Sequence, residues 1–190
     1  MLTVAEKTAL LKLAREAIES RVNGNRPKNF NAKTASLNQD SGAFVTLHKD
    51  GMLRGCIGTF SSPTALYDTI MDLAISAATQ DPRFMPLEPE ELESITIEVS
   101  VLTPLKEITD ISEVEAGRHG LYIIKGRNRG VLLPQVAIEN GFDRQTFLSQ
   151  TCMKAGLPRD AWRSGATIFT FEAEVFREED FRDGAAASPF

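Results

Sequence analysis

The chain has few of the residues that most often reveal a protein's chemistry. Its 190 residues include two cysteines, two histidines and one tryptophan. Two cysteines, Cys56 and Cys152, are too few for a disulfide scaffold in a chain of this length. The sequence also contains no CxxC, HxxxH or HExxH spacing and no recognisable cofactor loop. It therefore predicts neither a metal site nor a bound cofactor.

Long hydrophobic segments are missing as well. No apolar run approaches the roughly 20 residues that a membrane-spanning helix needs. The N-terminal segment is charged throughout, unlike a signal peptide. We therefore expect a cytoplasmic protein that does not bind a membrane. The net charge of −5 argues against a general nucleic-acid binder, although it does not exclude a local basic patch.

What the sequence does contain is a clear order of elements. Thr3 and Glu6 form a T-x-x-E capping box in front of apolar residues at helical spacing, which predicts a helix over residues 4–22. Residues 23–42 are polar and rich in turn formers, and they predict a long loop. Asp50-Gly51 favours a tight hairpin turn, since this dipeptide supplies the positive φ angles that such turns require.

The rest of the chain continues this alternation of strands and helices. We expect strands at 43–48, 52–60, 95–102, 121–125, 131–133 and 167–176, helices at 63–79, from Pro134 and at 143–155, and a fraying tail at 178–190. The order is therefore α, ββαβ, ββαβ. It predicts an α+β fold of mostly antiparallel strands, built from two duplicated β-rich halves flanked by helices. No matching residues are evident between the two halves.

One predicted strand, MLRGCIGTF at 52–60, has an unusual composition. Side-chain alternation places Arg54, Cys56 and Gly58 on one face. A guanidinium beside a thiol favours the thiolate, and a glycine in a strand lets a ligand or another chain segment approach closely. The alternative is a buried, unreactive cysteine with glycines that mark a bulge or a packed crossing.

Several stretches together resemble the AMMECR domain family. LRGCIGTF at 53–60 is close to the family's signature, and further agreement follows in the family's order at Asp81–Phe84, Val99–Leu105, Leu132–Leu157 and Trp162. Phe142 stands where the family often has tryptophan. The resemblance extends from the first helix to the last strand, which is nearly the whole chain.

The resemblance implies a fold, a set of partners and a site. It implies a single AMMECR domain over residues 1–190, in which two β-β-β-α-α repeats share one barrel-like sheet. Two subdomains are compatible with it, the larger containing the helix 4–22 and the strand 167–176. Prokaryotic members resemble one component of a three-part system with a Memo-type protein and a radical S-adenosylmethionine enzyme. The signature is the family's suggested functional site, and here it corresponds to Arg54, Gly55, Cys56 and Gly58.

Further candidates are Asp81, Arg83, His119, Glu98 and Gln135, and all but Gln135 have a structural alternative. Arg83 could join Arg54 in an anion site, or it could pair with Asp81 to hold a loop. His119 could act as a general base beside the Cys56 thiol if the two halves converge, or it could have a structural role.

Glu98, on the polar side of a predicted strand, could be an acid or base if that side lines a Cys56 cavity, or it could face water. Gln135 follows Pro134 at a helix start, where backbone N–H groups favour anions. Phosphates of a nucleotide or RNA could bind a local basic group, or this group could be a solvated hairpin tip; its members are Arg118, Lys125, Arg127 and Arg129.

These residues support two hypotheses of function, beside a third in which the signature is a purely structural strand inside an interaction scaffold. In the first, the chain is a binding or accessory component that holds its partner in a groove at residues 54–58. In the second, it is an enzyme with Cys56 as a reactive thiolate activated by Arg54, and His119 or Glu98 moves protons. The sequence offers a site without a complete catalytic set, which favours the first hypothesis.

Overall fold

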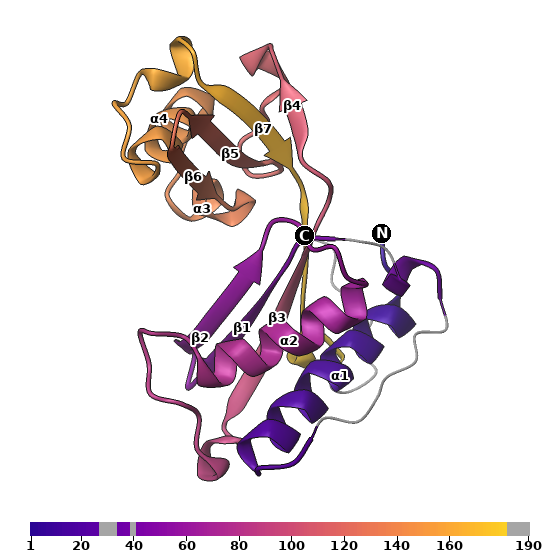
Figure 1. Cartoon of the computed structure of the whole chain (residues 1–190). Helices are drawn as coiled ribbons and strands as arrows, with labels where there is room; N and C mark the ends of the chain where they lie inside the picture. Colours follow the sequence, from indigo (N-terminus) through magenta and orange to yellow (C-terminus); the bar gives the residue numbers. More distant parts are fainter. Residues whose placement is uncertain (27–33, 39–40, 182–190) are drawn as a thin grey trace. The chain divides into compact units, whose positions relative to one another are not determined.

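The computed structural model describes residues 1–26, 34–38 and 41–181 (Figure 1). The chain divides into two compact units, and each is described by itself. The first unit comprises Met1–Val101 together with the chain from Glu174, and the second comprises Leu102–Ala173. Within the described ranges, no helix is long and apolar enough to cross a membrane. Part of the predicted loop at 23–42 lies outside the described residues, as does most of the predicted tail.

The first unit is a four-stranded sheet with two helices on one face. Its elements are α1 (Val4–Val22), β1 (Ala43–Lys49), β2 (Met52–Thr59), α2 (Leu66–Thr79), β3 (Ile95–Leu102) and β8 (Ala173–Arg177), with the strands in the order β2-β1-β3-β8. β1 is antiparallel to both β2 and β3. The predicted capping box of α1 is formed: the Glu6 N–H donates to the Thr3 hydroxyl, and the Thr3 N–H donates to the Glu6 carboxylate.

One face of the first sheet forms a core with α1 and α2, which lie side by side over it (Figure 1). Alternate residues of β1 and β3 are fully buried on this face: Val45, Leu47, Ile97 and Val99. They belong to the same hydrophobic cluster as Leu10, Ile18, Ile70 and Ala74 of the helices. Because side chains alternate along a strand, the intervening residues point to the opposite face.

The second unit repeats this arrangement. Its elements are β4 (Lys106–Ile108), β5 (Gly120–Lys125), β6 (Asn128–Leu132), α3 (Pro134–Glu139), α4 (Arg144–Lys154) and β7 (Thr167–Phe171), with the strands in the antiparallel order β4-β7-β5-β6. Its core lies between one face of the sheet and the helices. Leu121, Ile123 and Ile168 of the strands pack there among Phe147, Leu148, Cys152 and Trp162.

Both units contain the ββαβ order predicted for each half. A hairpin is followed by a helical segment and then by a third strand, which pairs with the first strand of the hairpin. The sheet orders β2-β1-β3 and β6-β5-β7 therefore correspond. The fourth strands are exchanged between the units: β4 follows β3 in the sequence but pairs with β7, and β8 follows β7 but lies beside β3.

The two hairpins also match at one residue, which the sequences of the halves do not make evident. Gly55 lies opposite Leu47 on β1, and Gly130 occupies the corresponding position opposite Ile123 on β5. A Cβ on Gly55 would lie 2.3 Å from the carbonyl oxygen of Ala77 in α2, and a Cβ on Gly130 would lie 2.5 Å from the Ala155 nitrogen just after α4. Each glycine therefore lets a helix approach its hairpin strand closely.

Several elements differ from the prediction. The strand predicted over 167–176 is two strands in different sheets, interrupted at Glu172, whose backbone bonds to Thr103 instead. Only β8 therefore belongs to the unit that contains α1. The short strand β4 was not predicted. The second hairpin turns at Gly126-Arg127 alone, so β6 begins at Asn128, three residues earlier than expected.

Two further differences concern α2 and the sheet. α2 begins at Leu66 rather than near Pro63, because the Ser62 hydroxyl bonds to Thr64 and Thr69 in a turn that precedes the helix. The strands form two open four-stranded sheets, and no closed barrel is found in the described part of the chain. The barrel-like sheet implied by the family resemblance is therefore not confirmed.

Candidate functional site

The signature strand β2 lies at the edge of the first sheet, and side chains from the loop after α2 cap its outer peptide groups. The Cys56 N–H donates to Asp81 Oδ2 at 2.8 Å, and Arg83 Nη2 donates to the Cys56 carbonyl at 3.2 Å. An edge strand otherwise presents such groups to other chains. Asp81 and Arg83 therefore terminate the sheet at Cys56.

Asp81 is held by several charged hydrogen bonds. Its side chain is 1% exposed, and it accepts bonds from the Nε, Nη2 and backbone N–H of Arg83 as well as from Cys56. These bonds, those from the Arg83 side chain above all, hold the pKa of Asp81 well below its usual value. The geometry is the loop-holding pair given above as the structural alternative for these two residues.

Arg54 occupies a β-bulge, and its side chain binds Glu91. Leu47 lies opposite Gly55 and His48 opposite Leu53, so Arg54 has no partner on β1. Its Nε and Nη2 donate to the two Glu91 oxygens at 3.0 and 2.8 Å. The hydrogen bond from Arg54 is the main reason that the pKa of Glu91 is lowered to about 2.

The structure does not bring Arg54 and Arg83 together as a free anion site. Each guanidinium is paired with its own carboxylate, and both lie over the ring of Phe84, at 5.9 and 5.5 Å from its centroid. Arg54 therefore secures the loop after α2. The Cys56 thiol instead contacts Thr46, whose Oγ1 is 3.3 Å from Sγ.

Other parts of the chain cover the two signature glycines. α2 lies against Gly55, and a Cβ on Gly58 would lie 2.0 Å from the ring of Phe44. The interpretation that another chain segment approaches these glycines agrees with this packing. A bulge, which was one alternative for the glycines of this strand, is also present, but its extra residue is Arg54.

Next to the signature, polar side chains line the sheet face that the helices do not cover. Thr46 lies opposite Cys56 on one side and opposite Glu98 on the other, so all three side chains point the same way. Glu98 is 8% exposed and accepts a hydrogen bond of 2.5 Å from Arg177 Nε. Glu98 therefore lies on the same face of the sheet as Cys56, with one strand between them. We call the surface formed by Thr46, His48, Cys56, Glu98 and the Arg177 side chain the polar face.

His48 has a buried nitrogen that forms no hydrogen bond within the described part of the chain. Its Nε2 makes no hydrogen bond with any described residue, and it lies 4.0 Å from Glu98 Oε2. Buried polar atoms are nearly always hydrogen-bonded, so a bound group or water is expected here. A cavity of about 420 Å³ lies at this position, lined by His48, Asp50, Gly51, Ser94, Thr96, Arg177 and Glu179. We call it the polar pocket.

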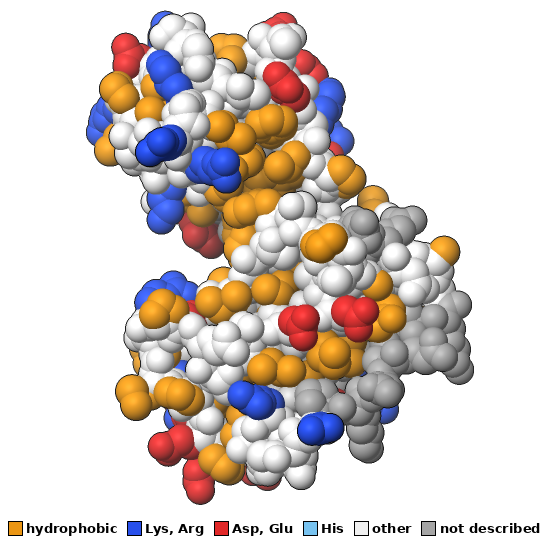
Figure 2. Space-filling view, viewed as in Figure 1, with side chains coloured by type: hydrophobic (Ala, Val, Ile, Leu, Met, Phe, Trp, Pro, Cys, Tyr) orange, Lys and Arg blue, Asp and Glu red, His pale blue; other side chains and the backbone are white. Residues whose placement is uncertain are grey.

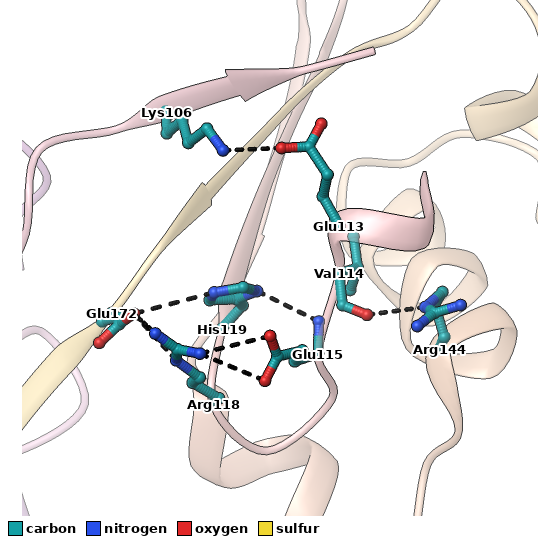
Figure 3. Close-up of polar contacts among 8 residues, drawn as sticks. All are labelled: Lys106, Glu113, Val114, Glu115, Arg118, His119, Arg144 and Glu172. Atoms are coloured by element: carbon teal, nitrogen blue, oxygen red, sulfur yellow. Dashed lines mark hydrogen bonds and ion pairs between the residues drawn. The ribbon is translucent and has the colours of Figure 1, made fainter. Parts of the chain in front are cut away.

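His119 lies in the second unit within a charged network (Figure 3). Its Nδ1 accepts the Glu115 N–H at 3.1 Å, so the neutral ring has its proton on Nε2, 3.9 Å from Glu172 Oε1. Arg118 bonds to both Glu115 and Glu172. These contacts tie the segment before β5 to the end of β7, which favours the structural role for His119. Cys56 belongs to the other unit.

The remaining candidates also lie in the second unit. Gln135 is the second residue of the six-residue helix α3 and is half-buried. In the basic group, Lys125 Nζ donates to the Ser164 carbonyl at 2.7 Å. Arg127 and Arg129 are exposed and form no hydrogen bond or ion pair with described residues.

Three residues of the polar face have no distinguishing mark in the sequence. Alternation in β1 places Thr46 and His48 on one side, but only the strand pairing shows that this side adjoins Glu98. Arg177 belongs to a strand whose sheet partner could not be foreseen. In the described ranges, no group of three or more His, Cys, Asp or Glu residues could hold a metal ion.

The fold and the site define a class of protein, an α+β chain of two corresponding units with a capped signature strand beside a polar pocket. The AMMECR1 family model matches residues 11–176, and the chain belongs to this family. It is 46% identical to a protein of Methanosarcina acetivorans over 95% of each chain. It is 41% identical to a protein of Methanocaldococcus jannaschii, over 96% of this chain and 94% of the other. The crystal structure of an uncharacterized protein from Pyrococcus horikoshii is similar, with 39% identity, 90% of each chain covered and a TM-score of 0.81.

Proposed function

We propose that the chain is a binding component of a multi-protein modification system, and that its polar pocket receives a side chain of the partner. The observation that supports this most directly is the buried Nε2 of His48, which has no hydrogen-bond partner among the described residues and lies at the cavity. An unsatisfied buried polar group costs about 1–3 kcal/mol. A partner atom that bonds to Nε2 removes this cost on binding.

The charges of the pocket favour a cationic group. Asp50 and Glu179 line it, and Glu98 lies next to His48. Arg177 is the one Lys or Arg among the lining residues, and it is already bound to Glu98. A lysine or arginine side chain, or an amino terminus, complements this arrangement electrostatically.

The family resemblance supplies the candidate partners, a Memo-type protein and a radical S-adenosylmethionine enzyme. The sequence favours a binding groove at residues 54–58, whereas this proposal assigns binding to the neighbouring polar face. Arg54, Gly55 and Gly58 are held within the fold, whereas the Cys56 side chain reaches the polar face through Thr46. In this proposal the signature strand holds the edge of the sheet in place, and of its side chains only Cys56 adjoins the binding surface.

The test is calorimetric titration of the chain with each purified partner from the same organism. His48→Phe keeps a ring but removes the nitrogens, and we expect it to weaken binding about tenfold, the equivalent of one charge-assisted hydrogen bond. Glu179→Gln should weaken binding severalfold, and more so at low salt. Glu16→Gln, an exposed position on α1, is the matched control and should change nothing. The proposal is contradicted if the chain binds neither partner, or if both pocket variants bind with wild-type affinity.

Cys56 supports a second candidate function, that of an enzyme with a reactive thiolate. Its side chain is partly exposed on the polar face, whereas Cys152 is fully buried. The test is the pH profile of alkylation in a Cys152→Ser background. A midpoint well below the ~8.5 of a free thiol favours the enzyme. Labelling only after unfolding would exclude it and leave Cys56 as part of the binding surface.

A further inference from the structure

The second sheet also has a face opposite its helices, but this face is apolar and aromatic. α3 and α4 share a core with alternate residues of β5 and β7, namely Leu121, Ile123 and Ile168. The intervening residues therefore point to the other side of the sheet. They are Tyr122, Ile124 and Phe169, joined by Val131 opposite Tyr122, and all four are partly exposed. We call these four residues the aromatic platform.

The two rings of the platform lie next to each other on the central strands. Tyr122 of β5 and Phe169 of β7 are directly opposite in register. Their ring centroids are 5.9 Å apart and the ring planes are inclined by 33°. Aromatic side chains on the open face of an antiparallel sheet are a common means of stacking unpaired bases, and this stacking tolerates any base because every base has a π-face.

Positive charge lies along one edge of the platform. Arg129 on β6 is opposite Ile124, so its side chain is on the platform side, and Arg127 follows in the hairpin turn. Neither is paired with a described residue. Figure 2 shows hydrophobic side chains gathered on the second unit with Lys and Arg side chains beside them. Glu107 lies opposite Phe169 at the other edge, so phosphates are favoured only at the β6 edge.

The charge of the chain is also divided unequally. Residues 102–173 contain nine Lys and Arg against eight Asp and Glu, a net charge of +1. The rest of the chain contains twelve against eighteen, a net charge of −6. The negative net charge of the whole chain therefore comes from the first unit, and the second unit does not repel a polyanion through its net charge.

We propose that the aromatic platform binds single-stranded nucleic acid, with bases stacked on Tyr122 and Phe169 and phosphates held by Arg127 and Arg129. This surface is independent of the polar pocket. Two partly exposed rings with two exposed arginines at one edge match a chain of stacked bases with its phosphates on one side.

The test is fluorescence anisotropy of the full chain with a labelled RNA of about twelve nucleotides and mixed sequence, within the range of site sizes known for single-strand binders. Phe169→Leu and Tyr122→Leu remove a ring and keep an apolar side chain. Each should weaken binding about 5- to 100-fold, as expected for the loss of one stacked base. Arg129→Gln should weaken binding similarly for all sequences and lower the slope of log affinity against log salt by about 0.7.

Lys154→Gln is the matched control, since it removes one exposed cation of the same unit from the last turn of α4. It should leave both affinity and salt slope unchanged. The proposal is overturned if wild-type protein does not bind at about 100 µM, the weak end of non-specific binding. It is also overturned if the ring variants bind as the wild type does, or if sedimentation shows a dimer that Phe169→Leu dissociates, because the platform is then an interface between copies.

Discussion

Replacing Gly55 by alanine tests why the signature strand contains a glycine. The added Cβ would lie 2.3 Å from the Ala77 carbonyl oxygen, a backbone atom of α2 that cannot rotate away. Overpacking of this kind costs about 1–3 kcal/mol and occasionally more. The unfolded chain loses freedom in the variant, which offsets about 0.4–1 kcal/mol. We therefore expect a net destabilisation of about 1–2 kcal/mol, or a melting temperature lower by about 2–8 °C.

The assay is thermal unfolding followed by far-UV circular dichroism and by tryptophan fluorescence. Trp162 is the single tryptophan and lies buried in the second unit, so its fluorescence reports on that unit. Far-UV dichroism follows the helices and strands of both units. Gly130→Ala, the corresponding change in the second unit, should therefore lower both midpoints, and Gly55→Ala should lower the dichroism midpoint. Met52→Ala, at an exposed position of the same strand as Gly55, should stay within about 0.5 kcal/mol of wild type. A Gly55→Ala midpoint equal to that of Met52→Ala would refute the close approach of α2.

Three further changes test other contacts. Asp81→Asn removes the charge that caps Cys56 and Arg83 and should cost about 2–3 kcal/mol in urea unfolding; the exposed Asp72→Asn is its control, and equal midpoints would refute the capping. Because the folded pKa of Glu91 is about 2, below its usual 4.5, its contribution is complete above pH 4.5 and is lost as the pH falls towards 2. Glu91→Gln should therefore flatten this acid limb of stability, and an unchanged limb would mean that Arg54 does not hold the carboxylate. Thr3→Ala should cost about 1 kcal/mol through the lost cap of α1, and a loss below about 0.3 kcal/mol would contradict the capping box.

The local elements could be predicted because their causes lie within a few residues. The capping box of α1 needs only Thr3 and Glu6, and the observed bounds of that helix equal the predicted ones. The first hairpin turns at Asp50 and Gly51, whose φ angles of 52° and 74° are the positive values that this dipeptide favours. Alternation in 95–102 likewise predicted β3, because it places the apolar side chains of Ile95, Ile97 and Val99 together on the core face of a single strand.

The candidate site could be predicted only in part, because its contacts join distant segments. Asp81 and Arg83 were identified, but their role depends on an edge strand 25 residues earlier in the chain. Arg54 was assigned to the face of Cys56 from regular alternation. The bulge in the pairing with β1 breaks this alternation at Arg54, and the Arg54 side chain binds Glu91 instead. Regular alternation does not give the position of this bulge.

The sequence by itself determined the order of the elements, the first helix and turn, the signature and the family. Caps, turns and alternation are set by short-range sterics and hydrogen bonds, so they can be recognised without a structure. The tertiary structure decided that β4 and β8 are exchanged between two sheets, that Gly55 and Gly130 serve the same contact, and that His48 meets Glu98 and Arg177. Strand pairing and helix approach depend on the packing of the whole core, which no short stretch of sequence specifies.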